Sequence, residues 1–126
     1  MFKRIDHVEI IAKDFDASLK FYTEILGFKV KQQMQVDAAP LQEIAYLELG
    51  DTVLELMRVD EPTAVDDDDW RMGYRMMALE VEDMDKALWY LAGKGVAITW
   101  GPVKIGPSKR VEIHDVDGFP IELRQW

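Results

Sequence analysis

The sequence contains no cysteine, and this absence removes several classes of site at once. Without a thiol the chain has no disulfide framework, no thiolate nucleophile and no cysteine-ligated metal. It also lacks an apolar run long enough to span a membrane, and its first six residues contain no apolar signal core. These features fit a reducing compartment, so we expect a cytoplasmic protein without a membrane partner.

Basic residues are scarce as well. The chain has 15 lysines and arginines against 24 aspartates and glutamates, and its net charge at pH 7 is −9. A nucleic-acid surface needs a basic patch that neutralises phosphates, so we expect no nucleic-acid partner. Part of the acidic excess is the uninterrupted run at 66–69, which is typical of a solvated loop.

What the sequence does contain is one order of elements that occurs twice. Hydrophobic alternation, helical spacing and turn residues predict strand, helix and three strands in the first half, at 4–12, 14–27, 28–35, 44–49 and 52–58. The second half predicts the same order, at 75–81, 83–95, 96–100 and a closing hairpin over 111–125, after a loop at 101–108. The polar stretch between the halves, 59–74, has no period and indicates a linker.

Residue spacing supports a duplication. The predicted helix caps Asp14 and Asp83 are 69 positions apart, and Glu55 and Glu122 are 67 apart. Each of these glutamates interrupts an apolar strand, so its side chain is expected to point away from its apolar neighbours. We therefore interpret the chain as an internal repeat.

The predicted fold class is α+β, with two βαβββ modules in a single domain over residues 1–126. Module one covers about 1–58, the linker 59–74 and module two 75–126. The two sheets are expected to form an eight-stranded half-open barrel with the helices outside and a cavity within. Because edge strands need partners, the modules could pair within one chain or be exchanged between chains, and we expect a two-fold homodimer.

Four stretches resemble the vicinal oxygen chelate superfamily, which includes glyoxalase I, methylmalonyl-CoA epimerase, extradiol dioxygenases, fosfomycin-resistance enzymes and bleomycin-binding proteins. They are IDHVEIIAKDFDASLKFYTEILGF, YLELGDTVLELM, MMALEVEDMDKALWYLAGKGV and HDVDGFPIEL. The resemblance implies one metal ligand on the first and last strand of each module. Three of these positions are His7, Glu55 and Glu122, and the fourth, where a histidine is expected, is Met76.

A methionine thioether is a soft, weak ligand for zinc, nickel, manganese or iron. The resemblance therefore implies a divalent metal held weakly by His7, Glu55 and Glu122, or no metal at all. One imidazole and two carboxylates still leave open positions for water and substrate, as at catalytic zinc sites. Taken one at a time, each of the three residues could be an ordinary strand residue without a special role. Their placement at matching positions of the repeat favours a metal site instead.

Two functions follow from the resemblance. The first is a glyoxalase-like lyase or isomerase that acts on a small carbonyl or thioester-type substrate through an enediolate, with Glu55 or Glu122 accepting a proton. The alternative is a metal-free protein that sequesters an apolar or aromatic small molecule, as bleomycin-resistance relatives do, and methionine liners favour it. An extradiol dioxygenase ranks third, because its site needs two histidines. The side chains that we expect to line the substrate cavity are Met76, Met57, Glu9, Trp100 and Arg110.

Overall fold

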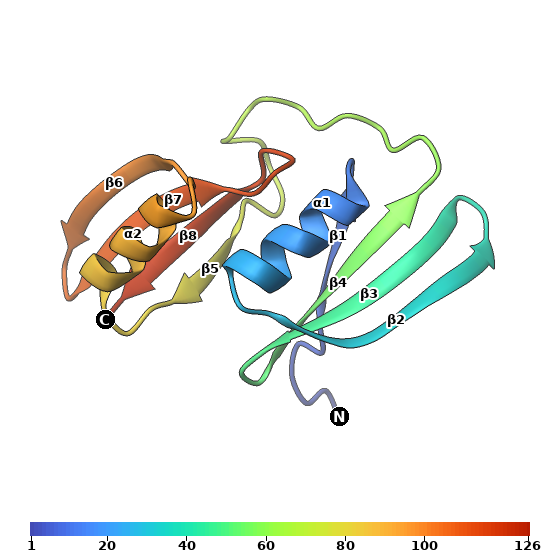
Figure 1. Ribbon diagram of the computed structural model, residues 1–126, viewed down its shortest axis with the longest axis horizontal. Coiled ribbons are helices and arrows are strands. Elements are labelled where there is room, and N and C mark those ends of the chain that lie inside the picture. Colours follow the sequence, from blue (N-terminus) through green and yellow to red (C-terminus); the bar gives the residue numbers. More distant parts are fainter. The chain divides into compact units, whose positions relative to one another are not determined.

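The computed structural model describes residues 1–126, which divide into two compact units, Met1–Val65 and Asp66–Trp126 (Figure 1). The first unit contains β1 (Val8–Ala12), α1 (Phe15–Lys20), the π-helical turn η1 (Phe21–Ile25), β2 (Lys29–Ala38), β3 (Leu41–Leu49) and β4 (Thr52–Val59). The second contains β5 (Met77–Glu80), α2 (Met84–Gly93), β6 (Ile98–Ile105), β7 (Ser108–His114) and β8 (Pro120–Gln125). The predicted α+β fold class with two βαβββ modules is confirmed, and the eight strands form two four-stranded sheets that are not closed.

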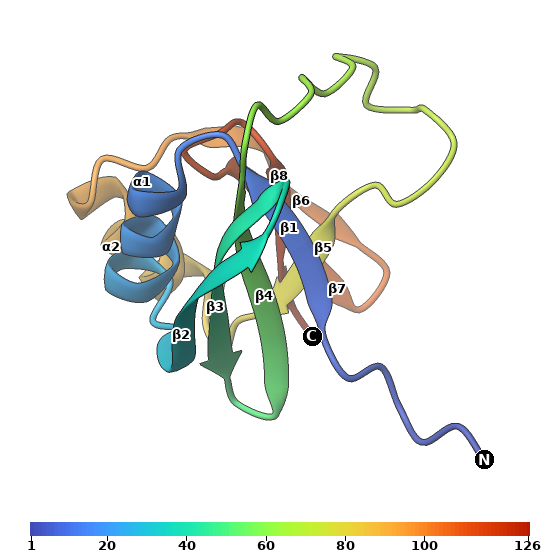
Figure 2. The ribbon, with the colours of Figure 1, turned by 90° about the vertical axis from the view of Figure 1, so that its right-hand side faces the viewer.

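The sheet of the first unit has the strand order β1-β4-β3-β2, in which β1 and β4 are parallel and the other pairs antiparallel. Helix α1 lies along one face of this sheet (Figure 2). The residues buried in this unit are mainly aromatic and aliphatic: Ala12, Phe15, Phe21, Tyr22, Phe28, Ala45, Leu47, Leu54 and Leu56. Because side chains alternate along a strand, the residue between Leu54 and Leu56 lies on the face away from this core.

The sheet of the second unit repeats this plan, with the order β5-β8-β7-β6 and a parallel β5–β8 pair. Its buried apolar residues come from α2 and the two central strands: Met84, Leu91, Val111, Ile113, Ile121 and Leu123. The side-chain oxygen of Gln125 accepts a hydrogen bond from the backbone nitrogen of Met84 at 2.6 Å, which ties the start of α2 to the end of β8. The two central strands therefore provide most of this core.

Both predicted helix caps are present. The carboxylate of Asp14 accepts a hydrogen bond from the backbone nitrogen of Ala17 at 3.0 Å, and that of Asp83 accepts one from Lys86 at 3.1 Å. Each bond satisfies a backbone donor that the first helical turn leaves unpaired. The first helix differs from expectation in one respect, because its second half widens into the π-helical turn η1.

The loop predicted at 101–108 is wrong, because β6 continues to Ile105 and only a short turn separates it from β7. Pro102 is tolerated because β6 is an edge strand and its register with β7 shifts between Trp100 and Val103. Gly101 is needed there: its φ is +87°, and a Cβ atom would lie 2.7 Å from the carbonyl oxygen of Arg110. The first strand is also shorter than predicted and begins at Val8.

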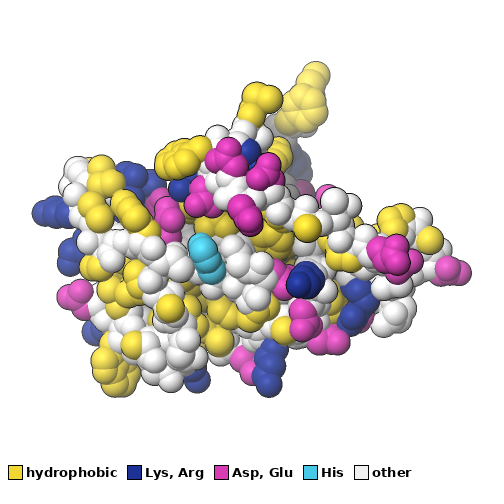
Figure 3. All heavy atoms as spheres, turned by 90° about the horizontal axis from the view of Figure 1, so that it is seen from above, with side chains coloured by type: hydrophobic (Ala, Val, Ile, Leu, Met, Phe, Trp, Pro, Cys, Tyr) yellow, Lys and Arg dark blue, Asp and Glu magenta, His cyan; other side chains and the backbone are white.

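Neither helix is long and apolar enough to cross a membrane. Figure 3 shows one face of the molecule, on which basic side chains are scattered among acidic and apolar ones. Several large apolar side chains are exposed in the segment between β4 and β5, namely Val65, Trp70, Met72 and Tyr74. This segment therefore presents apolar surface as well as the acidic run that the sequence predicts to be solvated.

The turn between β7 and β8 depends on Asp115, which is only 6% exposed. Its carboxylate accepts hydrogen bonds from the backbone nitrogens of Asp117 and Phe119, both at 2.9 Å. Gly118 completes the turn with a φ of +87°, and its nitrogen donates to the carbonyl oxygen of Asp115 at 3.1 Å. The turn predicted from the Asp and Gly residues is confirmed.

We expect Asp115→Ala to lower the free energy of unfolding by roughly 1–3 kcal/mol, because it leaves backbone donors unpaired in a buried turn. Asp115→Asn keeps an acceptor oxygen and should lose much less. Urea unfolding of both variants measures the difference. Equal losses in the two variants would show that the side-chain oxygen is not what stabilises the turn.

Candidate metal centre

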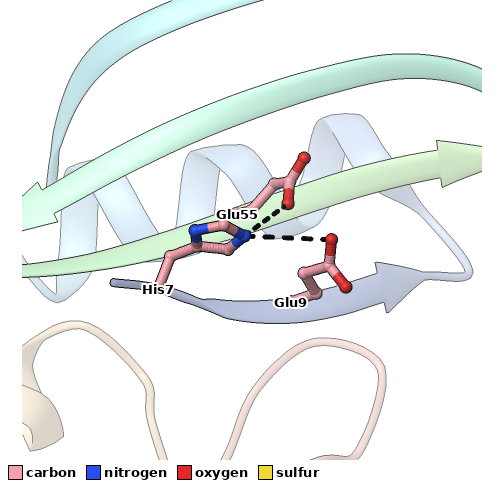
Figure 4. A group of neighbouring side chains, drawn as sticks. All are labelled: His7, Glu9 and Glu55. Atoms are coloured by element: carbon pink, nitrogen blue, oxygen red, sulfur yellow. Dashed lines mark ion pairs between the residues drawn. The ribbon is translucent and has the colours of Figure 1, made fainter. Parts of the chain in front are cut away.

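Two neighbouring strands of the first unit place an imidazole and two carboxylates side by side (Figure 4). His7 directly precedes β1, Glu9 lies within it, and Glu55 lies in β4. Glu9 and Glu55 are direct partners in the parallel β1–β4 register, so both side chains stand on the same face of the sheet. That face is opposite to the one on which Leu54 and Leu56 are buried.

The ligand atoms of these three residues all lie within 4.8 Å of one another. His7 Nε2 is 3.2 Å from Glu55 Oε2 and 3.9 Å from Glu9 Oε1. The other ring nitrogen, Nδ1, is 2.8 Å from Asp6 Oδ2. Asp6 thus orients the ring so that Nε2 faces the two glutamates, an arrangement that commonly supports metal-bound histidines.

Glu55 is the buried member of the group, with a side chain that is only 5% exposed. Burial raises its pKa, and the adjacent Glu9 raises it further, while a hydrogen bond from Tyr46 and the charge of His7 oppose the rise. No lysine or arginine pairs with Glu55. The negative charge of this carboxylate therefore has only the His7 imidazolium, or a bound cation, to balance it.

Two residues that contact this group, Asp6 and Tyr46, were not predicted from the sequence. Tyr46 lies opposite Glu55 in the antiparallel β3–β4 register, and its ring meets the His7 ring edge to face at a centroid distance of 5.9 Å. The charge of Glu55 raises the pKa of the Tyr46 hydroxyl. Asp6 could have been suspected from its position next to His7, whereas Tyr46 could not, because the β3–β4 register is invisible in the sequence.

Among the residues predicted to line the substrate site, Met57 lies two positions after Glu55, on the same face and beside Ile11 of β1. It is half-buried. Glu9 is itself one of the three residues grouped around His7 Nε2. The first unit therefore contains four of the predicted site residues, His7, Glu9, Glu55 and Met57, on one face of one sheet.

In the second unit Glu122 lies in β8, and its Oε1 accepts a hydrogen bond from Nε of Arg124 at 2.6 Å. Glu112 is its partner in β7, and Trp100 in β6 is the partner of Glu112, so the three form one row across the sheet. Met76 directly precedes β5, and its sulfur is 3.4 Å from an Nη1 atom of Arg75. The predicted Trp100 and Glu122 thus share a face of the second sheet.

Arg110 lies next to this row, as the β7 partner of Arg124. Its Nε donates to Ser108 Oγ at 3.0 Å, and no carboxylate pairs with its guanidinium. Like charges directly opposite each other on neighbouring strands are unfavourable. Glu122 already offsets the charge of Arg124, so Arg110 is the member of this pair that has no carboxylate partner.

The donor set of the first unit fits a divalent metal. Imidazole nitrogen and carboxylate oxygen are the ligands that zinc, nickel, manganese and iron accept in proteins. The buried Glu55 charge lacks a permanent basic partner, and the His7 ring is already held with one nitrogen toward the carboxylates. In this unit His7 and Glu55 would hold such an ion, and Glu9 lies beside them.

We expect the pKa of His7 to lie above its usual value of 6.5, chiefly because of the hydrogen bond to Asp6 and, after it, the charges of Glu55 and Glu9. Asp6→Asn should lower it. Because the folded pKa exceeds the unfolded one, the stabilisation from the imidazolium is complete below the unfolded pKa and is lost as pH rises through the folded pKa. NMR titration of the His7 ring measures its pKa in wild type and in Asp6→Asn, and His114→Ala identifies which ring signals belong to His7.

The same comparison by urea unfolding should show the larger stability difference between wild type and Asp6→Asn on the acidic side of the His7 titration, while Asp6 is still ionised. An unchanged His7 pKa in Asp6→Asn would contradict the role of Asp6. So would a stability difference that grows as pH rises.

Comparison with known proteins agrees with this fold. The family model described as Glyoxalase/Bleomycin resistance protein/Dioxygenase superfamily matches residues 4–123. Uncharacterized protein YaeR of Escherichia coli is 30% identical, over 96% of this chain and 95% of that one. A glyoxalase family protein of Enterococcus faecalis has a structure that matches with a TM-score of 0.83, at 29% identity and 98% coverage of both chains.

A second solved structure is that of the trypanothione-dependent glyoxalase I of Leishmania major, with a TM-score of 0.78 and 30% identity over 98% of this chain and 87% of that one. The sequence match and the structural match therefore both extend over nearly the whole chain. The chain belongs to the glyoxalase/bleomycin resistance protein/dioxygenase superfamily.

Proposed function

We propose that the protein is a glyoxalase-like, metal-assisted lyase or isomerase that acts on a small carbonyl or thioester-type substrate. The observation that supports this most is the buried Glu55 carboxylate, which faces His7 Nε2 at 3.2 Å and has no lysine or arginine partner. The likeness to the Leishmania major glyoxalase I supports the reaction class. In this proposal the metal ligands are His7, Glu55 and Glu122.

A divalent ion at these ligands would supply a Lewis acid that polarises a carbonyl oxygen. The chain itself supplies the base. Glu55 or Glu122 would accept the proton from the hydroxyl-bearing carbon beside the carbonyl, which gives an enediolate, and would return that proton to the neighbouring carbon. Burial raises the pKa of Glu55, which makes its carboxylate a stronger base, and the hydrogen bond from Arg124 holds one oxygen of Glu122 in place.

Substrate contacts are proposed on the faces that bear these glutamates. Met57 and Met76 would supply adaptable apolar contacts and Trp100 a flat aromatic one. Arg110, which no carboxylate neutralises, would meet a negative group of the substrate. The proposed substrate is therefore a small carbonyl compound with an anionic group.

The reaction is tested by solvent deuterium exchange into α-hydroxy-carbonyl and hemithioacetal candidates, with and without added nickel, zinc, manganese or iron. We expect metal-dependent exchange. Glu55→Gln and Glu122→Gln should each slow it by roughly 100-fold or more, since proton transfer by a positioned base contributes about that much. His7→Ala should abolish the metal dependence.

A metal-free binding protein is the competing function, and Met76 in place of a ligand favours it. It would behave in the opposite way. Affinity for some aromatic compound would depend on Met57 and Met76, the carboxylates would be dispensable, and no candidate would exchange in a metal-dependent manner. That pattern would replace the enzymatic proposal with the sequestering one.

We also propose that the protein assembles as a homodimer and that it works in the cytoplasm. The exposed apolar side chains between β4 and β5 support an assembly, because a monomer rarely leaves several large ones uncovered in one segment. Trp70 is 81% exposed and Met72 and Tyr74 are fully exposed. Light scattering at micromolar concentration should give twice the mass of the 14.6 kDa chain, and a monomeric mass would contradict the dimer.

A further inference from the structure

The two modules differ at one strand position that the repeat makes equivalent. In the first module Glu9 is the β1 partner of Glu55, and in the second Ala78 is the β5 partner of Glu122. The same offset places Met76 where the first module has His7. The first module therefore has two donor side chains at the start of its first strand, and the second module has none.

Glu9 is placed to use this position. Its Oε1 is 3.9 Å from His7 Nε2, and its ligand atom lies within 4.8 Å of those of both His7 and Glu55. Figure 4 shows dashed lines from His7 Nε2 to one carboxylate oxygen of Glu9 and to one of Glu55. No lysine or arginine pairs with Glu9 or Glu55, so His7 is the only basic side chain paired with these two carboxylates.

Glu55 provides evidence for a metal site that does not depend on the exposed Glu9. Its carboxylate is nearly completely buried, it is directed at the same point as Glu9 Oε1 and His7 Nε2, and its charge has no permanent basic partner. Buried charges in proteins are paired or coordinate metals. A solvated Glu9 would add repulsion to a carboxylate that is already costly, whereas a cation between the two would remove it.

We propose that Glu9 is a metal ligand beside His7 and Glu55, and that its carboxylate takes the place, in the donor set, of the imidazole that the sequence lacks at position 76. This inference rests on the proposed metal site and adds one ligand to it. With Glu9 added, the proposed ligands are the imidazole of His7 and the carboxylates of Glu9, Glu55 and Glu122. The family resemblance implies two imidazoles and two carboxylates instead. Manganese prefers carboxylate oxygen, whereas zinc and nickel accept imidazole nitrogen well. A carboxylate in place of an imidazole therefore shifts the metal preference of the site from zinc and nickel toward manganese.

The experiment is titration calorimetry of the full chain, stripped with a chelator, with Mn²⁺ and with Zn²⁺. The matched control is Glu82→Gln, which removes the same charge from an exposed glutamate of the second unit. We expect Glu9→Gln to weaken Mn²⁺ binding by at least roughly tenfold, the lower end of the range for losing residues that support a metal ligand. Glu82→Gln should leave it unchanged.

Two further variants refine the test. Glu9→Asp separates metal coordination by Glu9 from its negative charge, and Met76→His tests whether Glu9 takes the place of the missing imidazole. Glu9→Asp keeps the charge but shortens the reach, so a ligand role predicts a loss similar to that of Glu9→Gln, and full retention would overturn it. Met76→His should raise Zn²⁺ affinity relative to Mn²⁺. In the Glu9→Gln background, Met76→His should restore Zn²⁺ binding more than Mn²⁺ binding.

His7→Ala distinguishes the two levels of the proposal. If His7→Ala binds both ions as well as wild type does, the proposed metal site is wrong and the role of Glu9 is wrong with it. If His7→Ala loses binding but Glu9→Gln behaves like Glu82→Gln, the metal site stands and the role of Glu9 is overturned. Glu9 is exposed, so Glu9→Gln should fold normally, and an unfolding temperature in chelator no lower than that of wild type confirms that the affinities are comparable.

Discussion

The structure of the candidate site depends on one buried charge. Glu55 is enclosed by its own strand and its neighbours, and the residues that touch it are an imidazole, a tyrosine hydroxyl and a second carboxylate. None of these is a permanent cation. A carboxylate in this position is unfavourable unless a proton or a metal neutralises it. The fold maintains it because the apolar side chains on either side of Glu55 are buried in the core, which fixes the direction in which Glu55 points.

The fold could be predicted well because the signals that specify it are either local, such as helix caps and turns, or periodic, such as the repeat. Asp14 and Asp83 cap their helices through bonds that span three residues, and the hairpin turn follows from the Asp and Gly residues between β7 and β8. The repeat then places Glu55 and Glu122 in equivalent strands. Each of these inferences needs only spacing along the chain.

The contacts across strands could not be predicted in this way. The Tyr46–Glu55 and Glu9–Glu55 neighbours depend on register, which a sequence does not reveal and which shifts at bulges such as those in β2. The loop predicted around Pro102 failed for a related reason. A proline usually indicates a break, but on an edge strand next to a bulge the missing donor costs little.

The two modules have diverged around a shared plan. In the first, Asp6 orients His7 toward two glutamates, and in the second Glu122 is held by Arg124 while Met76 stands in the place of a ligand. The donors to a metal are thus concentrated in the first module, and arginines in the second. In the proposed function, His7 and Glu55 of the first module hold the metal, and Arg110 of the second module meets an anionic group of the substrate.

Anomalous scattering from crystals soaked in Mn²⁺ tests the account most directly, because it locates the ion. We expect one strong peak within bonding distance of His7 Nε2 and of a Glu55 carboxylate oxygen. This expectation would be contradicted by a peak only at the acidic run between β4 and β5, or by no peak when the ion is saturating.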